Sequence, residues 1–302
     1  MNASLKCKEC LFNKNISNAQ IFSKEQIVGF EKGVTELIEK FGNIKSAPYI
    51  QSKIDELYGT CFGKRRDFND IKKTYNLYML EKEEIIRSAI QASDDIISAC
   101  IKFACVGNYI DFGVIDNVDS NVLERIFEKA KSDELNSENL LRFKKDLEKA
   151  KKLVYLTDNC GEIVLDKVFM EILKNLYPEL TVTAVVRGGD TLNDATLSDA
   201  EMIGLGKVAD VISNGTAIPG TDIEEISDEA KKALQEADII ISKGQGNFET
   251  MFGEGFNTYF IFMCKCQMFV ERFGLKQYSL VFANENDIKK RFPFKESQSC
   301  SL

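Results

Sequence analysis

Residues 153–162, LVYLTDNCGE, decide the fold of this chain. The run from Leu153 to Leu156 is apolar throughout, which is typical of a strand buried on both faces of a sheet. Asp158 and Asn159 follow almost at once, and a helical stretch covers residues 162–176. A buried strand that ends in polar residues and leads into a helix indicates a βαβ unit.

The same pattern recurs through the second half of the chain. Further apolar runs lie at residues 182–186, 208–212, 237–241 and 279–283. Helical stretches such as 227–236 lie between them. Repeated units of this kind predict an α/β fold, a Rossmann-like, doubly wound and mostly parallel sheet.

The first half of the chain has the periodicity of helices instead. Ser23 and Gln26 form a capping box ahead of a helical stretch, and apolar residues recur at helical spacing over 77–106, as one long helix or two. The expected organisation is an all-helical N-terminal region at residues 1–148, a Rossmann-like domain carrying a metal site at 149–290, and a tail at 291–302.

The composition argues against several classes of partner. The 302 residues carry a formal net charge of −8, whereas a nucleic-acid ligand would need a basic face. No apolar run is long enough to span a membrane, and the first residues lack the apolar core of a signal peptide. Nine cysteines, an odd number, fit reduced thiols. We expect a cytoplasmic protein that binds neither nucleic acid nor a membrane.

The chain contains no histidine. This absence excludes histidine general bases, Ser-His and Cys-His nucleophile pairs, and histidine-ligated zinc. Catalysis must therefore use carboxylates, amides, lysine, arginine, cysteine or a bound metal.

Polar residues follow each predicted strand, at the sheet edge where ligands bind in doubly wound folds. Asp158, Asn159 and Asp194 offer the oxygen ligands that a hard divalent cation such as Mg²⁺ or Mn²⁺ prefers. Arg187 and Lys243 supply the positive charge that an acidic protein needs to hold a phosphate. Gly244 and Gly246 allow the main chain to approach an anion closely.

Simpler structural interpretations exist for these residues. Asp158 and Asp194 are each suited to cap a helix, and Arg187 could be a solvated cation. After Gly107, a natural helix end, Asn108 and Asp111 fit a turn.

Two further groups of residues have the chemistry of a binding site. Lys265 is a candidate third cation beside the apolar run 259–263. Cys7 and Cys10 have the spacing of half a structural zinc site, with Cys264 and Cys266 as a poorly spaced partner pair. Ordinary thiols are the favoured interpretation.

Taken together, these motifs resemble the damage-control phosphatase family, also called domain of unknown function 89, and its mainly prokaryotic branch with a CxxC pair. The matching motifs are Cys7/Cys10 and residues 66–76, 107–111, 158–162 with Asp166, 193–195, 243–249 and 265–266.

The resemblance implies a helical region packed on a Rossmann-like domain, and one divalent cation (Mn²⁺, Mg²⁺, Co²⁺ or Ni²⁺). It implies metal ligation by Asp158, Asn159 and Asp194. Phosphate would be held by Lys243, with Asn108, Asp111 and Arg187 nearby. The implied substrates are small phosphorylated metabolites such as sugar phosphates or damaged side products. Cys160 departs from the small residues usual in the family.

The resulting hypothesis is metal-assisted hydrolysis, in which Asp158, Asp194 and Lys243 are catalytic and Arg187, Gly244 and the cations hold phosphate. Attack by water and attack by Asp158 are both open. Two rival functions are a methyl-transferring or nucleotide-binding Rossmann protein, and a non-catalytic sensor of a phosphometabolite. Against the first, strand one is followed by DNCGE and not by the glycine-rich fingerprint GxGxxG.

Overall fold

A single six-stranded sheet organises the computed structural model, which describes residues 1–107, 124, 127–130 and 134–291. The strand order is β3-β2-β1-β4-β5-β6, and every pair is parallel except β5 with β6. The strands are β1 (Lys152–Leu156), β2 (Thr181–Val186), β3 (Asp210–Ser213), β4 (Ile239–Lys243), β5 (Thr258–Met263) and β6 (Leu280–Asn284). The predicted Rossmann-like fold class is confirmed.

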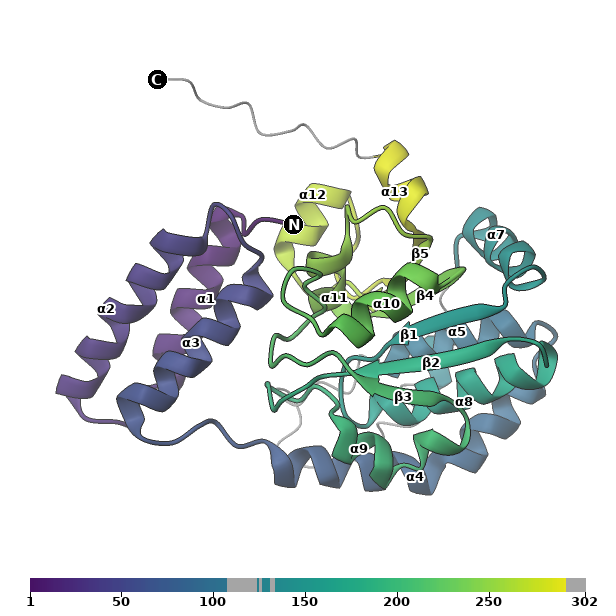
Figure 1. Ribbon diagram of the computed structural model, residues 1–302, viewed down its shortest axis with the longest axis horizontal. Coiled ribbons are helices and arrows are strands. Elements are labelled where there is room, and N and C mark those ends of the chain that lie inside the picture. Colours follow the sequence, from purple (N-terminus) through teal and green to yellow (C-terminus); the bar gives the residue numbers. More distant parts are fainter. Residues whose placement is uncertain (108–123, 125–126, 131–133, 292–302) are drawn as a thin grey trace.

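Both faces of the sheet are buried because successive side chains of each strand enter different cores. In β1, Leu153 and Tyr155 belong to one apolar cluster, while Val154 and Leu156 belong to the other. The first cluster includes α4, α5 and α8, and the second includes α1–α3 and α11. The chain is therefore layered as helices, sheet and helices (Figure 1).

The helices before β1 are α1 (Leu5–Asn18), α2 (Lys24–Phe41), α3 (Ala47–Phe62), α4 (Asn69–Gln91), α5 (Ile96–Val106) and α7 (Ser137–Leu147). Figure 1 shows α1–α3 grouped at one side, joined to α4 by an extended connection. Serine hydroxyls cap the first three. Ser23 accepts from the N–H of Gln26, so the Ser23 half of the predicted capping box is confirmed, whereas the Gln26 side chain donates to the carbonyl of Cys61 instead.

Within the second half, the helices are α8 (Glu162–Leu176), α9 (Leu197–Met202), α10 (Asp228–Glu236), α11 (Gly244–Met251), α12 (Gln267–Phe273) and α13 (Glu285–Arg291). A short 3₁₀ turn, η2, covers Leu205–Lys207. Among the described residues, no helix is both long and apolar enough to cross a bilayer.

Three parts of the chain were not fully specified by the sequence-based prediction. The stretch 77–106 belongs to two helices, because the chain breaks at residues 92–95 and Asp95 caps α5 by accepting from the N–H of Ser98 at 3.1 Å. The apolar run 259–263 is strand β5, which the periodicity did not identify. Helix α1, which carries Cys7 and Cys10, was not predicted.

The strand order reverses between β1 and β4. The chain builds β1, β2 and β3 outward in one direction and then returns to place β4 against the other side of β1. In open α/β sheets, a crevice opens at such a reversal, beyond the carboxyl ends of the strands. Residues that follow β1 and β4 therefore meet in the region where a ligand is expected.

Candidate active site at the carboxyl edge of the sheet

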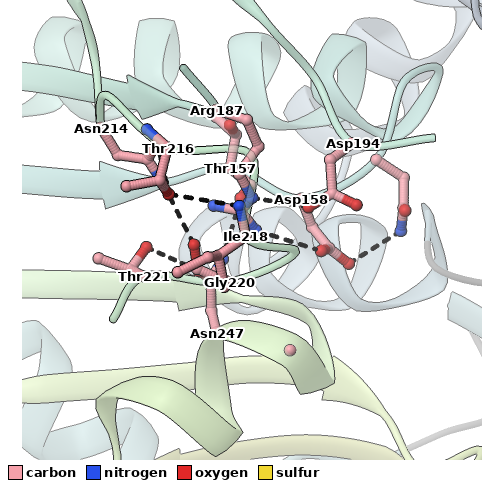
Figure 2. A network of polar contacts seen from close by, with 12 residues as sticks. Thr157, Asp158, Arg187, Asp194, Asn214, Thr216, Ile218, Gly220, Thr221 and Asn247 are labelled. Carbon is pink, nitrogen blue, oxygen red and sulfur yellow. Dashed lines mark hydrogen bonds and ion pairs between the residues drawn. The ribbon is translucent and has the colours of Figure 1, made fainter. Parts of the chain in front are cut away.

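The loops after β1 and β2 are joined to each other by main-chain hydrogen bonds. The N–H of Cys160 donates to the carbonyl of Asn193 at 2.9 Å, and the N–H of Ala195 donates to the carbonyl of Asp158 at 2.8 Å. This bridge places Asn159 opposite Asp194. Three residues predicted as metal ligands are consequently brought together. Figure 2 shows two of them, Asp158 and Asp194, near each other.

Arg187 lies between the two carboxylates of this group. Its Nε donates to Asp194 Oδ2 at 2.6 Å, and its Nη2 lies 3.7 Å from Asp158 Oδ1. Only 1% of the residue is exposed, and Nη1 and Nη2 have no hydrogen-bond partner among the described residues. Buried guanidinium N–H groups are normally satisfied, so this arrangement is suited to receive an anion.

The electrostatics of the carboxylates favour a cation. Burial, the charge of Asp194 and the charge of Glu162 raise the pKa of Asp158 well above its ordinary value, although Arg187 and Lys243 oppose the shift. Burial likewise raises the pKa of Asp194, against the opposing effect of Arg187. Two neighbouring buried carboxylates whose pKa values are both raised would be stabilised in their ionised form by a divalent cation.

Asn159 can complete such a ligand set through its side-chain oxygen. Its Nδ2 donates to Asp158 Oδ2 at 2.8 Å and to Glu162 Oε2 at 3.0 Å. Because both bonds use Nδ2, Oδ1 is used by neither and can serve as a ligand. Within the described residues, no three Cys, Asp or Glu groups gather at one metal-binding point. The candidate set accordingly consists of two carboxylates and one amide, which suits a hard cation.

Lys243 lies next to this group and is buried, away from solvent. Its ammonium is fully buried and forms ion pairs with Glu162 and, at 2.8 Å, with Asp166. Burial lowers the pKa of Lys243, but the two carboxylates outweigh that effect and the pKa is raised. Its charge also lowers the pKa of Asp158. Direct contact of Lys243 with phosphate stays a prediction.

Asp166 and Tyr155 complete the buried ion cluster. Tyr155 donates its hydroxyl to Asp166 Oδ1 at 2.7 Å. Burial raises the pKa of Asp166 to about 6, with Lys243 opposing the shift. Glu162 and Asp166 are four residues apart on α8, so they share one helix face. That spacing is the sequence signal for this cluster, although neither residue is among the predicted site residues.

Gly244 has a steric reason to be glycine. Its φ is +79°, and a Cβ added there would lie 2.0 Å from Asp158 Oδ2. The first residue of α11 thus contacts the carboxylate directly. Asn247, one turn later, donates Nδ2 to the carbonyl of Thr157 at 2.9 Å and to the carbonyl of Lys243 at 2.7 Å. The ends of β1 and β4 are therefore fastened together at the site.

The loop after β3 forms the remaining side. Asn214 Oδ1 accepts from the N–H of Gly188 at 2.9 Å and from the N–H of Thr216 at 3.0 Å. Thr221 donates its hydroxyl to Asn247 Oδ1 at 2.8 Å. Figure 2 shows these residues beside Arg187, so loops from four strands contribute to one network.

Three further residues were predicted to bind phosphate: Lys265, Asn108 and Asp111. Lys265 follows β5 at the same sheet edge, and its N–H donates to Gln245 Oε1 at 2.9 Å. Asn108 and Asp111 lie outside the described residues.

The cysteines form no disulfides among the described residues. The eight described cysteines, Cys7 and Cys10 included, are all free thiols. The buried thiol of Cys160 interacts with Asp199 and Asn76, and burial raises its pKa.

A cavity of about 510 Å³ opens next to this cluster. It lies between α3, the α3–α4 connection and the loops after β2 and β3. Thr191 and Thr216 line it, and the N–H of Asp194 donates to the carbonyl of Thr191 at 3.1 Å. The Thr191 hydroxyl is buried and has no hydrogen-bond partner among the described residues. The volume is in the range of small-molecule sites.

Fold and cluster together define a Rossmann-like α/β protein whose candidate site stands at the carboxyl edge of its parallel strands. Residues 3–281 match the model of the damage-control phosphatase ARMT1-like domain. The chain belongs to this family.

Archaeal relatives extend the comparison. The chain is 28% identical over 286 residues to a damage-control phosphatase of Archaeoglobus fulgidus, covering 93% of this chain and 98% of the relative. It is 32% identical over 213 residues to damage-control phosphatase PH1575 of Pyrococcus horikoshii, covering 68% and 72%. The uncharacterized protein MJ0202 of Methanocaldococcus jannaschii is 28% identical over 280 residues, covering 89% and 91%.

A solved structure shares the fold over nearly its full length. The crystal structure of PH1575, described as a DUF89 family protein, superposes with a TM-score of 0.82 at 26% identity. The match covers 94% of this chain and 99% of that one. The helical first half and the sheet are thus both part of the shared fold.

Proposed function

We propose that this protein is a divalent-metal-dependent phosphatase that hydrolyses phosphate monoesters of small metabolites. The observation that carries the proposal is Arg187, a buried guanidinium beside two carboxylates, two of whose nitrogens have no hydrogen-bond partner in the part of the chain that the structure describes. A phosphoryl group would satisfy those nitrogens, and Asp158 and Asp194 would hold a cation that offsets its negative charge. Membership of a family whose archaeal relatives are named damage-control phosphatases supports the same reaction.

The metal would be held by Asp158, Asn159 and Asp194, with Mn²⁺, Mg²⁺, Co²⁺ and Ni²⁺ as the candidates. A bound divalent cation would polarise the phosphoryl oxygens and lower the pKa of a water molecule. Arg187 would orient the phosphoryl group and stabilise the negative charge that develops on it. The charge of Lys243 favours the ionised form of Asp158, and Glu162 and Asp166 share its ammonium.

The leaving group would occupy the cavity beside the site. Most of the residues that line it are polar or charged, including Thr191, Thr216, Asn69 and Arg65. Such a wall suits a hydroxylated carbon chain better than an aromatic or lipid group. Sugar phosphates and damaged or side-product phosphometabolites are therefore the proposed substrates. The proposed setting is the cytoplasm, which the free thiols of the described cysteines support.

Two routes of attack fit the site. In one, water attacks phosphorus and the alcohol leaves as the P–O bond breaks. In the other, Asp158 Oδ attacks, the alcohol leaves, and water then hydrolyses the acyl phosphate. Rapid quenching followed by mass spectrometry distinguishes them, because only the second route leaves a phosphoryl group on Asp158.

The direct test removes and restores the metal. Protein stripped with a chelator should release no phosphate from an aryl phosphate or from a panel of sugar phosphates. Addition of Mn²⁺, Mg²⁺, Co²⁺ or Ni²⁺ separately should restore release, because the two carboxylates need a cation to bind the anion. Asp194→Asn should remain inactive with every metal. Folded protein without turnover under all of these conditions would contradict the proposal and favour a sensor or a methyl-transferring protein.

Arg187→Gln should reduce kcat/KM by about 10²–10³-fold, since it removes a preorganised donor to the developing charge. Metal binding should persist, so added Mn²⁺ should still raise the midpoint of thermal unfolding. The matched control is Arg87→Gln. Arg87 pairs with Glu83 and Glu171 on the helical side, and its loss should leave kcat/KM within about twofold. Equal losses in the two variants would show that Arg187 acts only through stability.

A further inference from the structure

The loop that carries Asp158 and Asn159 is fastened to a helix from the other half of the chain. Asn76, in the middle of α4, is fully buried, and its Oδ1 accepts from the N–H of Gly161 at 2.6 Å. Its Nδ2 donates to Asp199 Oδ1 at 3.0 Å. One side chain therefore contacts both the turn after β1 and the segment after β2.

Lys72 repeats this connection one helical turn earlier. Its ammonium lies 2.9 Å from Asp199 Oδ2 and 3.3 Å from Asp190 Oδ1. Lys72 and Asn76 share one face of α4 because they are four residues apart. Asp190 and Asp199 flank Asp194 in the sequence, so Lys72 binds the second ligand segment on both sides.

Asp199 also binds the main chain near Asp194 through Thr196. Its Oδ2 accepts from the N–H of Thr196 at 2.9 Å and from the Thr196 hydroxyl at 2.7 Å. Thr196 pairs in turn with Arg187, whose N–H donates to the carbonyl of Ala195 at 2.9 Å. The main chain on either side of Asp194 is thus held by a carboxylate that α4 positions.

The packing of Gly161 supports the same connection independently of any hydrogen bond. Its φ is +76°, and a Cβ added there would lie 3.1 Å from Tyr75 Cβ. Tyr75 is itself buried on α4. The turn after Asp158 is therefore shaped to lie directly against this helix.

We infer that Asn76 and Lys72 are positioning residues that set the separation between the two halves of the metal site, Asp158 with Asn159 on one side and Asp194 on the other. The inference rests on the proposed metal site. Neither side chain is assigned to the metal or to the phosphate. Asn76 acts through Gly161 and Asp199, and Lys72 acts through Asp199 and Asp190, as outer partners that orient ligands in metal centres do.

Asn76→Ala should raise the Mn²⁺ concentration that gives half-maximal phosphatase activity by about 10–100-fold. At saturating Mn²⁺, KM for an aryl phosphate should change by less than about threefold, because Arg187 is untouched. Lys72→Met should shift the same metal midpoint in the same direction. Asn76→Ala combined with Lys72→Met should shift it by less than the product of the two single changes, since both act through Asp199.

The matched control is Asn139→Ala. Asn139 is also a buried asparagine, but it accepts from the N–H of Asn284 at 2.8 Å. Asn284 pairs with Tyr259 near the start of β5, at the edge of the sheet opposite the site. Its loss should lower the unfolding midpoint without moving the metal midpoint. A metal midpoint in Asn76→Ala equal to that of Asn139→Ala would overturn the inference.

Direct calorimetric titration of Mn²⁺ into stripped protein separates the two proposals. Weakened Mn²⁺ binding in Asn76→Ala, in a protein whose wild type shows no turnover, would support the positioning role and contradict the phosphatase. Normal turnover in the wild type with unchanged Mn²⁺ affinity in Asn76→Ala would support the phosphatase and contradict the positioning role.

Discussion

Asp158→Asn should abolish turnover and yet make the metal-free protein more stable. The loss of activity, about 10³-fold or more, is expected because the variant removes a charged ligand from the proposed cation site. The gain in stability is expected because Asp158 and Asp194 are buried close together and the charge of Asp194 raises the pKa of Asp158. An amide of the same shape ends that repulsion.

The sign of the pH effect follows from the direction of the pKa shift. The pKa of Asp158 is higher in the folded protein than the value of about 3.9 in an unfolded chain. Above that value the unfolded chain has released more protons than the folded one, so stability falls as pH rises toward the folded pKa. Metal-free wild type should lose stability across this window, and Asp158→Asn should lose less.

Thermal unfolding across a pH series, with and without Mn²⁺, measures both effects. Wild type should gain stability from Mn²⁺ and Asp158→Asn should gain none. Asp222→Asn is the matched control, because burial also raises the pKa of Asp222 and its removal changes the net charge equally. If Asp158→Asn lowered the stability of the metal-free protein, the repulsion between the two carboxylates would be refuted.

Gly244→Ala should reduce kcat/KM by about 10²-fold, although no functional group is lost. An added methyl group would lie 2.0 Å from Asp158 Oδ2, so the carboxylate must move. A displacement of about 1 Å is enough for a loss of this size. Alanine at a φ of +79° is also strained, which lowers the free energy of unfolding by about 1–2 kcal/mol.

Gly253→Ala separates the backbone penalty from the displacement. Gly253 has a φ of +109°, and no atom lies within 4 Å of an added Cβ. This variant should lose stability but keep kcat/KM within about twofold of wild type. Activity and unfolding measured on both variants test the argument. Unchanged activity in Gly244→Ala would mean that Asp158 is not fixed by α11.

Much of this site could be predicted from the sequence because its residues follow strands. The run Leu153–Leu156 identified β1, and the parallel arrangement then placed Asp158, Arg187 and Lys243 at one edge. That inference needs no knowledge of strand order, since all carboxyl ends of parallel strands share an edge.

The remaining features depend on contacts that local patterns do not encode. Asn76 lies in the middle of a helix, and nothing in its neighbourhood marks a residue that contacts Gly161, 85 positions away. Strand β5 is buried on both faces, so its apolar run has no alternation to distinguish strand from helix. Lys243 was expected to face phosphate, and its ion pairs with Glu162 and Asp166 required the packing of α8 to be known.

The contacts of α4 also have a consequence for how the chain folds. The bonds from Lys72 and Asn76 span 118 and 85 residues, so closing them carries a large entropic cost and comes late. Helix α4 is synthesised before β1 and β2. The loops after β1 and β2 can therefore reach their final shape only after these strands have formed and packed on α4. Capture of the proposed cation would therefore belong to the fully folded protein, and a cation that binds there should stabilise both halves of the chain together.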